Sequence, residues 1–159
     1  MKIRTASLSE LLILHNQIDE LSPIANSDYF AERIGDKIYL ALVAEIEGVL
    51  VGYKLGYWLT ESIFYSWLGG VHPTHRKKGI AKQLLLEQER QVFEAGGTEV
   101  RVKSMNQFRS MLLLLIAQEY EITGTEMMQG QDIKILFSKH FNKKERANPL
   151  IRESTHEIT

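Results

Sequence analysis

A short basic segment near the middle of the 159-residue sequence has the residue types and spacing to bind an anion. It begins at residue 68, reads LGGVHPTHRKKGIA, and leads into a predicted helix that begins at Gly79. Arg76, Lys77 and Lys78 lie at the N-terminus of this helix, where the helix dipole disfavours each positive charge by about 0.3–1 kcal/mol. A phosphate would offset these charges and accept hydrogen bonds from the free N–H groups of the first helical turn. We therefore predict an anion site on the amides of residues 77–81.

An alternative interpretation of this segment involves no ligand. Thr74 would cap the helix, and the lysine side chains would extend into water. Gly79 favours the anion site, because a residue without a Cβ lets a ligand approach the backbone. The spacing excludes two other phosphate-binding motifs, since the sequence contains neither a P-loop nor a GxGxxG fingerprint.

The segment resembles the signature of the GNAT family of N-acetyltransferases, which is Arg/Gln-x-x-Gly-x-Gly/Ala after a hydrophobic strand that ends in Val-x-Pro. Here the signature stands as RKKGIA over residues 76–81, preceded by VHP over residues 71–73. The order of predicted elements over residues 2–140 is also similar. The resemblance implies acetyl-CoA as cosubstrate and direct transfer of its acetyl group to a primary amine of a small molecule or a peptide. It also implies that the coenzyme A pyrophosphate is held, mainly by backbone amides, at Arg76, Lys77, Lys78, Gly79, Ile80 and Ala81.

Two glycines, Gly69 and Gly70, end a predicted central strand. Such a pair is typical of a β-bulge or of a close approach by another chain. The resemblance implies that the pantetheine arm of the cofactor pairs with this strand like an additional strand. The implied main-chain contacts are then Leu68, Gly70 and Val71. The alternative is that packing alone requires the two glycines.

The helix after the next predicted strand carries a second group of implied contacts. Asn106 is a predicted N-cap and, by the resemblance, contacts the cofactor, while Arg109 is a candidate phosphate contact. The sequence departs from the family at this helix. Many members carry a tyrosine two turns into it that protonates the departing thiolate, whereas this chain has Leu113 and Leu114. We therefore expect release of the thiolate without that tyrosine, or its protonation by water.

The candidate general base is Glu61, at the start of the central strand. Some relatives place a catalytic glutamate on this strand where the present chain has Tyr65. Alternation puts Glu61 and Tyr65 on one face, and we hypothesise that Glu61 receives the amine proton through water molecules that pass Tyr65. The alternative is a solvated glutamate at a strand end.

Other residues bear on the acceptor. Aromatic residues on the adjacent central strands are candidates for an acceptor pocket, and four carboxylates would favour a cationic acceptor. The aromatic residues are Tyr53, Tyr57, Tyr65 and Trp67, and the carboxylates are Asp28, Glu32, Glu45 and Glu47.

The elements that position these residues follow from periodicity and turn signals. We expect strands over residues 2–6, 37–46, 49–59, 62–71, 98–104, 119–123 and 132–140. Helices are expected from Ser7 or Ser9 to near Pro23, over residues 28–34, from Gly79 to the glycines at 96–97, and from Asn106 onward. The predicted fold is α/β (α+β), a mixed and mostly antiparallel sheet of about seven strands with about four helices. Residues 1–140 form the predicted acetyltransferase domain and residues 141–159 a polar tail.

Composition limits the other classes of function. The chain has 44% hydrophobic residues, a formal charge of −1 and no cysteine, which excludes disulfide chemistry and disfavours a nucleic-acid-binding protein. We expect a cytoplasmic protein without a membrane span, and no metal site at His72 and His75 because a third ligand is missing. Two alternatives stay open. One is a non-catalytic CoA-binding sensor of the same fold, and the other is a nucleic-acid-binding module that uses residues 76–82 with Lys143, Lys144 and Arg146. A homodimer formed by the last strands and the tail is a further expectation.

Overall fold

The fold is a seven-stranded sheet with two helices on each face. It is described here from a computed structural model that defines residues 1–18, 21, 26–130 and 132–142. The strands are β1 (Lys2–Thr5), β2 (Tyr39–Ile46), β3 (Val49–Trp58), β4 (Ile63–Val71), β5 (Glu99–Met105), β6 (Glu121–Met127) and β7 (Ile133–His140). Their order in the sheet is β1-β2-β3-β4-β5-β7-β6, and β4 with β5 is the parallel pair. The predicted mixed, mostly antiparallel sheet is therefore confirmed.

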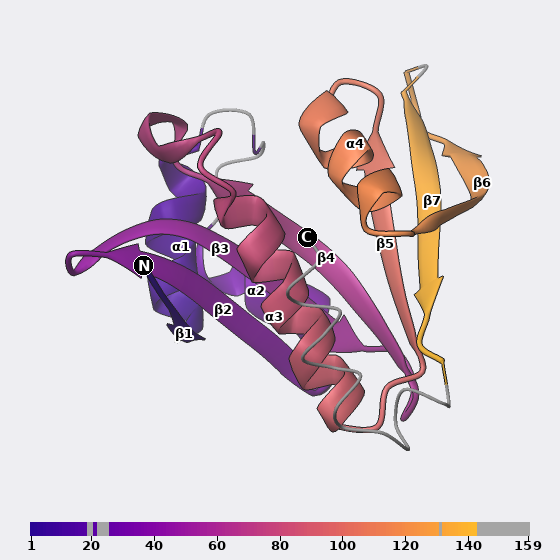
Figure 1. Ribbon diagram of the computed structural model, residues 1–159, viewed down its shortest axis with the longest axis horizontal. Helices are drawn as coiled ribbons and strands as arrows, with labels where there is room; N and C mark the ends of the chain where they lie inside the picture. Colours follow the sequence, from indigo (N-terminus) through magenta and orange to yellow (C-terminus); the bar gives the residue numbers. More distant parts are fainter. Residues whose placement is uncertain (19–20, 22–25, 131, 143–159) are drawn as a thin grey trace.

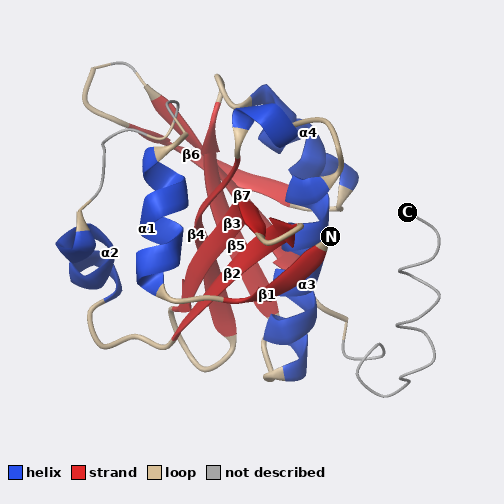
Figure 2. Cartoon of the chain, turned by 90° about the vertical axis from the view of Figure 1, so that its left-hand side faces the viewer, coloured by secondary structure: helices blue, strands red, loops and turns tan. Residues whose placement is uncertain are grey.

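The helices divide between the two faces of the sheet (Figures 1 and 2). They are α1 (Leu8–Asn16), α2 (Ser27–Ile34), α3 (Ile80–Glu94) and α4 (Arg109–Ala117), with a short 3-10 turn, η1 (Pro73–His75). One hydrophobic cluster joins α1 and α2 to β2, β3 and β4, and two others lie between the sheet and α3 and α4. Among the described helices, none combines the length and apolar character needed to cross a bilayer.

Local sequence signals explain the N-terminal elements. Ser7 caps α1 in a capping box with Glu10, and α1 ends at Asn16, earlier than the predicted end near Pro23. The β2–β3 turn falls on Glu47 and Gly48, with φ angles of 50° and 80°, which is the left-handed geometry that two-residue hairpins need.

The connection from β4 through α3 to β5 creates the feature that matters for function. β4 and β5 pair at four positions, from Ile63 with Glu99 to Ser66 with Val102, and then diverge. Figure 1 shows the two strands close together at one end and separated at the other. The gap between residues 67–71 of β4 and residues 103–105 of β5 is called the β4–β5 gap below.

Two predictions about local geometry are wrong. The irregularity in β4 lies at Trp67, which has no partner in the β3 register, and the ladder is regular at the two glycines that follow. Asn106 does not cap α4, because a turn at residues 106–107 precedes the helix and Phe108 occupies the N-cap without a side-chain hydrogen bond.

Candidate functional site

Among the described residues, no strand pairs with the edge of β4 that faces the β4–β5 gap. The N–H of His72 donates to the Val51 carbonyl at 2.8 Å, which fixes the alternation along the antiparallel ladder. By this alternation Gly70 and Leu68 direct their backbone groups toward β3, whereas Gly69 and Val71 direct theirs toward the gap. Of the predicted contacts, Val71 thus faces the gap and Leu68 and Gly70 do not. Sequence reasoning missed Gly69, although counting two residues back from Val71 would have found it.

Gly70 packs closely against side chains that follow α1. A Cβ at this position would lie 2.8 Å from the Ile18 side chain and 2.9 Å from the Leu21 side chain. Both residues follow the last turn of α1, which therefore covers the end of β4. Close packing thus accounts for a glycine at position 70, while the backbone groups of Gly69 lie on the edge that faces the gap.

The N-terminus of α3 lies directly after this strand. Gly79 is its N-cap, with φ of 77° and without a side-chain hydrogen bond, and no atom lies within 4 Å of where a Cβ would be. The helix's hydrogen bonds begin with Gln83 N–H to the Gly79 carbonyl at 3.1 Å, so the amides of Ile80 and Ala81 have no helical acceptor. These are the donors that an anion would need.

Thr74 takes no part in capping α3. Its hydroxyl lies 2.7 Å from Nδ1 of His72 and 2.8 Å from Nδ1 of His75, within η1. The alternative in which Thr74 caps the helix is therefore wrong. Among the described residues, no three His, Asp or Glu side chains gather as metal ligands would.

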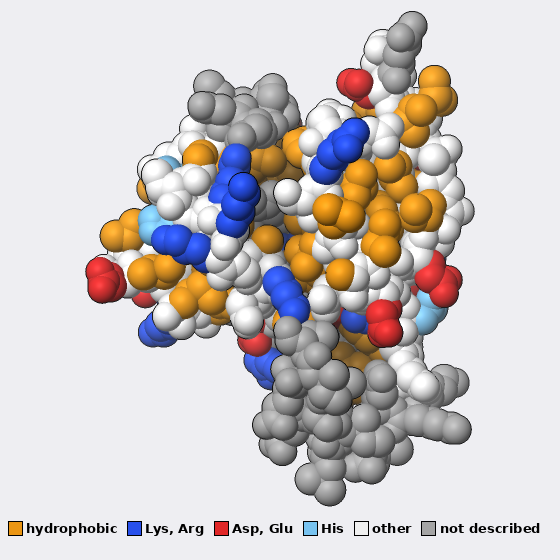
Figure 3. Space-filling model, turned by 45° about the horizontal axis from the view of Figure 1, so that its top comes forward, with side chains coloured by type: hydrophobic (Ala, Val, Ile, Leu, Met, Phe, Trp, Pro, Cys, Tyr) orange, Lys and Arg blue, Asp and Glu red, His pale blue; other side chains and the backbone are white. Residues whose placement is uncertain are grey.

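Basic side chains border the β4–β5 gap. Arg76, Lys77 and Lys78 are exposed on the loop before α3, and Arg109 is exposed at the first residue of α4 on the β5 side. Arg76 also turns back toward the strand, where its Nε donates to the Val71 carbonyl at 3.3 Å. Figure 3 shows Lys and Arg side chains on both sides of a hollow in the surface. Asn106 is exposed in the turn between β5 and α4.

Buried polar groups without partners lie on the α3 and α4 side of the sheet. In the described part of the chain, Ser66 Oγ, both amide atoms of Gln88 and the Tyr120 hydroxyl make no hydrogen bond. Ser66 is the last residue of β4 that pairs with β5, so its hydroxyl lies where the gap begins. Buried polar groups are normally hydrogen-bonded, and unpaired ones indicate a place for water or a ligand.

Lys54 was not found by the sequence analysis. It is 5% exposed, lies opposite Gly69 in the ladder, and places both its Cγ and its Nζ 3.6 Å from the position that a Gly69 Cβ would occupy. Burial lowers the pKa of the Lys54 ammonium to about 8. The missing side chain of Gly69 thus leaves room for a buried cation at the edge of the gap.

The opposite face of the sheet carries a groove of about 640 Å³, which we call the acceptor-side groove. Its residues come from six elements: Arg33 of α2, Tyr57 of β3, Tyr65 of β4, and side chains of β5, β6 and β7. It reaches the gap through Tyr65 and Lys103, since the Lys103 Nζ lies 5.9 Å from the centre of the Tyr65 ring. Of the aromatic residues proposed for a pocket, Tyr57 and Tyr65 line the groove, and Tyr53 is buried against His15 instead.

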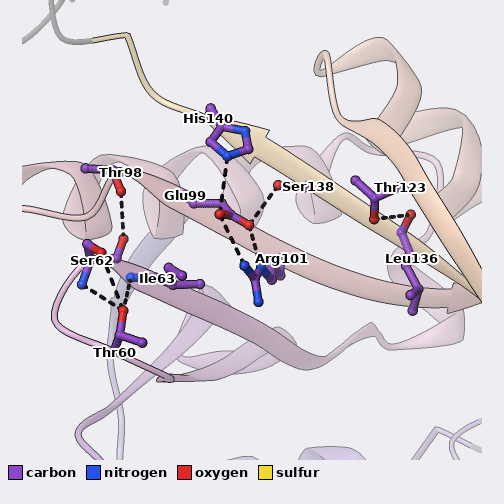
Figure 4. A network of polar contacts seen from close by, with 10 residues as sticks. All are labelled: Thr60, Ser62, Ile63, Thr98, Glu99, Arg101, Thr123, Leu136, Ser138 and His140. Carbon is purple, nitrogen blue, oxygen red and sulfur yellow. Dashed lines mark hydrogen bonds and ion pairs between the residues drawn. The ribbon is translucent and has the colours of Figure 1, made fainter.

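Ion pairs satisfy the carboxylates of the groove. Glu99 accepts hydrogen bonds from Arg101 Nε and, at 3.0 Å, from Ser138 Oγ, and its carboxylate lies 3.2 Å from Nε2 of His140 (Figure 4). The hydrogen bond from Arg101 is the main reason that the pKa of Glu99 is lowered. Glu126 pairs with Lys103 at 3.2 Å.

The structure does not bring Glu61 to Tyr65. Glu61 is exposed in the turn between β3 and β4, where Thr60 Oγ1 accepts hydrogen bonds from Ser62 N–H at 3.2 Å and Ile63 N–H at 3.0 Å (Figure 4). It is not among the residues that line the groove. Tyr65 is 7% exposed, and its burial raises the pKa of its hydroxyl to about 12, so this hydroxyl is protonated at neutral pH.

The four carboxylates expected to favour a cationic acceptor lie elsewhere. None of Asp28, Glu32, Glu45 and Glu47 lines the groove. Glu45 pairs with Arg4 at 3.4 Å, and Glu47 lies in the β2–β3 turn.

Comparison with known proteins places these features in a family. A family model described as the acetyltransferase (GNAT) family matches residues 8–111. Similar solved structures include yncA from Salmonella typhimurium with its cofactor acetyl-CoA, at 17% identity and a TM-score of 0.73 over 89% of this chain and 94% of that one. The ribosomal-protein-S18-alanine N-acetyltransferase from Escherichia coli has 12% identity and a TM-score of 0.75 over 87% and 92% of the two chains. The paia N-acetyltransferase from Thermoplasma acidophilum, in complex with coenzyme A, has 17% identity and a TM-score of 0.67 over 88% and 98%.

Proposed function

The chain belongs to the acetyltransferase (GNAT) family, and we propose that it transfers the acetyl group of acetyl-CoA to a primary amine. The observation that carries this proposal is the β4–β5 gap, where a strand edge that no described strand pairs with is followed, after the η1 turn, by a helix N-terminus without a side-chain cap. An extended amide chain with a pyrophosphate at one end has the chemistry to fill both parts. The cosubstrates named in two similar structures, acetyl-CoA and coenzyme A, have this composition.

The residues of the gap fit the parts of acetyl-CoA. The amides of Ile80 and Ala81 would hold the pyrophosphate, with Lys77 and Lys78 as surrounding positive charge. The Gly69 and Val71 edge would pair with the pantetheine arm, as a peptide pairs with an open sheet edge. Asn106 and Arg109 lie across the gap as candidate contacts to the cosubstrate.

In the proposed reaction the protein contributes mainly by positioning the amine against the thioester, and less by supplying acidic or basic groups. The amine nitrogen attacks the thioester carbonyl carbon, the C–S bond breaks, and the thiolate leaves with the electron pair while the nitrogen loses a proton. Holding the two reactants in contact supplies much of the rate enhancement. At the helix position where many relatives carry a tyrosine this chain has Leu113, which is 70% exposed, and Leu114, so water protonates the thiolate.

The fate of the amine proton defines a test of Glu61. The carboxylates that line the groove, Glu99 and Glu126, are both ion-paired, and Glu61 lies outside the groove, so it could act as the base only through a chain of water molecules from the turn between β3 and β4. A Glu61→Gln variant should then lose activity most strongly at low pH. Full activity of this variant at every pH would show that the amine proton passes directly to solvent and not to Glu61.

Acetyl-CoA binding is the first experiment. A ligand at about 100 times its Kd adds about 2.7 kcal/mol of stability, enough to raise the Tm by several degrees in a domain of this size. We expect acetyl-CoA to raise the Tm and acetyl-pantetheine, which lacks the pyrophosphate, to raise it less. The absence of any shift at millimolar acetyl-CoA would refute the proposed function.

A CoA-binding sensor without catalysis is the second candidate, favoured by the absence of the helix tyrosine. Release of the CoA thiol in the presence of an amine panel separates the two candidates. A sensor would bind acetyl-CoA and release no thiol with any amine.

A further inference from the structure

The acceptor-side groove carries an unmatched positive charge. Its carboxylates, Glu99 and Glu126, are paired with Arg101 and Lys103. Besides these two cations, the groove contains the permanently charged side chain of Arg33. Among the described residues, no carboxylate lies within ion-pairing distance of Arg33. The groove therefore presents a guanidinium that a substrate could neutralise.

Arg33 is held in place by aromatic residues. Its Nε donates to the Tyr57 hydroxyl at 3.0 Å, and its guanidinium carbon lies 5.3 Å from the centre of the Trp67 ring. Tyr57 is 4% exposed and packs edge-on against Tyr65 at 5.5 Å between ring centres, so the support is rigid. Among the described residues, the two terminal nitrogens of Arg33 form no hydrogen bond or ion pair, and a planar guanidinium fork matches a carboxylate in a bidentate arrangement.

The aromatic residues also connect Arg33 with the reaction centre. Tyr57 contacts Tyr65, and Tyr65 lies beside Lys103 where β5 begins to diverge from β4. A molecule bound to Arg33 at one end therefore runs along two aromatic rings toward the β4–β5 gap. Its other end lies where the amine must attack.

We infer that the groove takes an acceptor that carries a carboxylate in addition to its amine, such as an amino acid, and that Arg33 binds this carboxylate. This inference rests on the proposed function and deepens it by naming the class of acceptor. A polyamine or another purely cationic acceptor would meet an unpaired guanidinium and find both groove carboxylates already neutralised. Like charges without counter-charges disfavour such a complex.

The test compares matched acceptors. Amino acids of increasing chain length, their carboxamides and simple diamines are supplied with acetyl-CoA, and kcat/KM is measured from thiol release. A hydrogen-bonded charge pair predicts a preference of roughly 10- to 100-fold for the carboxylate over the matched carboxamide. A preference for carboxamides or diamines would overturn the inference and leave the proposed acetyltransferase function intact.

Variants assign the preference to Arg33. Arg33→Gln should raise KM for the carboxylates alone and remove the preference, and Arg33→Lys should restore part of it because the charge returns without the fork. Lys37→Met is the matched control, since the Lys37 Nζ lies 5.4 Å from the centre of the same Tyr57 ring but does not line the groove. Equal loss in the Lys37→Met and Arg33→Gln variants would show a general effect of charge and refute the role of Arg33.

A binding measurement does not depend on turnover. Calorimetry of an N-acetylated amino acid with the CoA-bound protein should show binding in the wild type and in Lys37→Met, but not in Arg33→Gln. The acetyl-CoA effect on Tm should be equal in all three proteins. Absence of N-acetylated amino acid binding in the wild type, together with a normal acetyl-CoA shift, would refute the inference alone.

Discussion

The two faces of the sheet at the β4–β5 gap present different chemical groups, and we call them the backbone-built face (the side of α3 and α4) and the side-chain-built face (the side of α1 and α2). On the α3 and α4 face, the candidate cosubstrate site consists mainly of backbone groups: the outer edge of β4 and the first amides of α3. On the α1 and α2 face, the acceptor-side groove consists of side chains from six elements. Backbone sites tolerate changes of side chain, whereas a site made of side chains changes its specificity with each substitution. The first face therefore suits a constant cosubstrate and the second a variable acceptor.

Lys54 lies on the backbone-built face, and the burial of its charge destabilises the native state. Its replacement should give the largest effect on stability. Burial lowers its pKa from 10.5 to about 8, which corresponds to about 3 kcal/mol of native-state destabilisation at pH 7. Lys54→Met should raise the free energy of unfolding by up to that amount. Because the native pKa lies below the unfolded one, the cost is complete below pH 8, falls as the pH rises from 8 to 10.5 and then disappears.

Urea unfolding of both proteins between pH 7 and 10.5 measures this difference. Lys37→Met, at an exposed position between α2 and β2, is the control. An advantage of Lys54→Met that stays constant over this pH range would contradict the explanation by charge burial.

Removal of one backbone donor should weaken cosubstrate binding. Gly69→Pro deletes an N–H that the β3 ladder does not use and leaves the β3–β4 pairing in place. We expect the KM for acetyl-CoA to rise by at least about 10-fold, through the lost hydrogen bond and the bulk of the ring. Gly69→Ala keeps the N–H and should show a smaller change; equal effects of the two variants would mean that this N–H binds nothing.

Acid should disrupt the side-chain-built face first. Glu99 has a lowered native pKa, mainly through the Arg101 hydrogen bond, so its stabilising contribution is present above its unfolded value of 4.5 and is lost as the pH falls below it. Solvent around the half-exposed Arg101 limits this contribution to about 1 kcal/mol. Glu99→Gln should be less stable than the wild type at pH 7, and the difference should shrink as the pH falls below 4.5, as measured by urea unfolding. A difference that does not change with pH would point to packing.

The smallest effect is expected from the surface lysines of the backbone-built face. The Lys77→Ala, Lys78→Ala double variant should raise the KM for acetyl-CoA by about 2- to 5-fold at low salt and less at high salt, because the two ammonium groups are exposed and screened. A loss as large as that of Gly69→Pro would show that side chains, and not amides, hold the phosphates. Kinetics at two ionic strengths provide the measurement.

The same contrast explains what could be predicted from the sequence. The parallel β4–α3–β5 unit lies in one continuous segment, so local signals were sufficient to predict the strand, the helix start at Gly79 and the following strand, while the anion site itself stays a prediction. Arg33 and Glu99 come together in the groove only through strand register and helix packing, which one sequence does not specify, and the burial of Lys54 on the other face depends on the same register. The prediction of Asn106 as an N-cap was wrong because helix propensity does not determine at which residue a helix begins after a strand. The predicted tail at 141–159 lies almost wholly outside the described residues.

The four-residue contact between β4 and β5 has a consequence for the protein without its cosubstrate. Beyond Ser66, the interior of the sheet contains an open strand edge, which is the kind of surface at which protein chains pair and aggregate. A bound pantetheine arm would complete the sheet as a temporary strand. The concentration of acetyl-CoA would then govern the solubility of this protein as well as its reaction, and each product release would briefly reopen the edge.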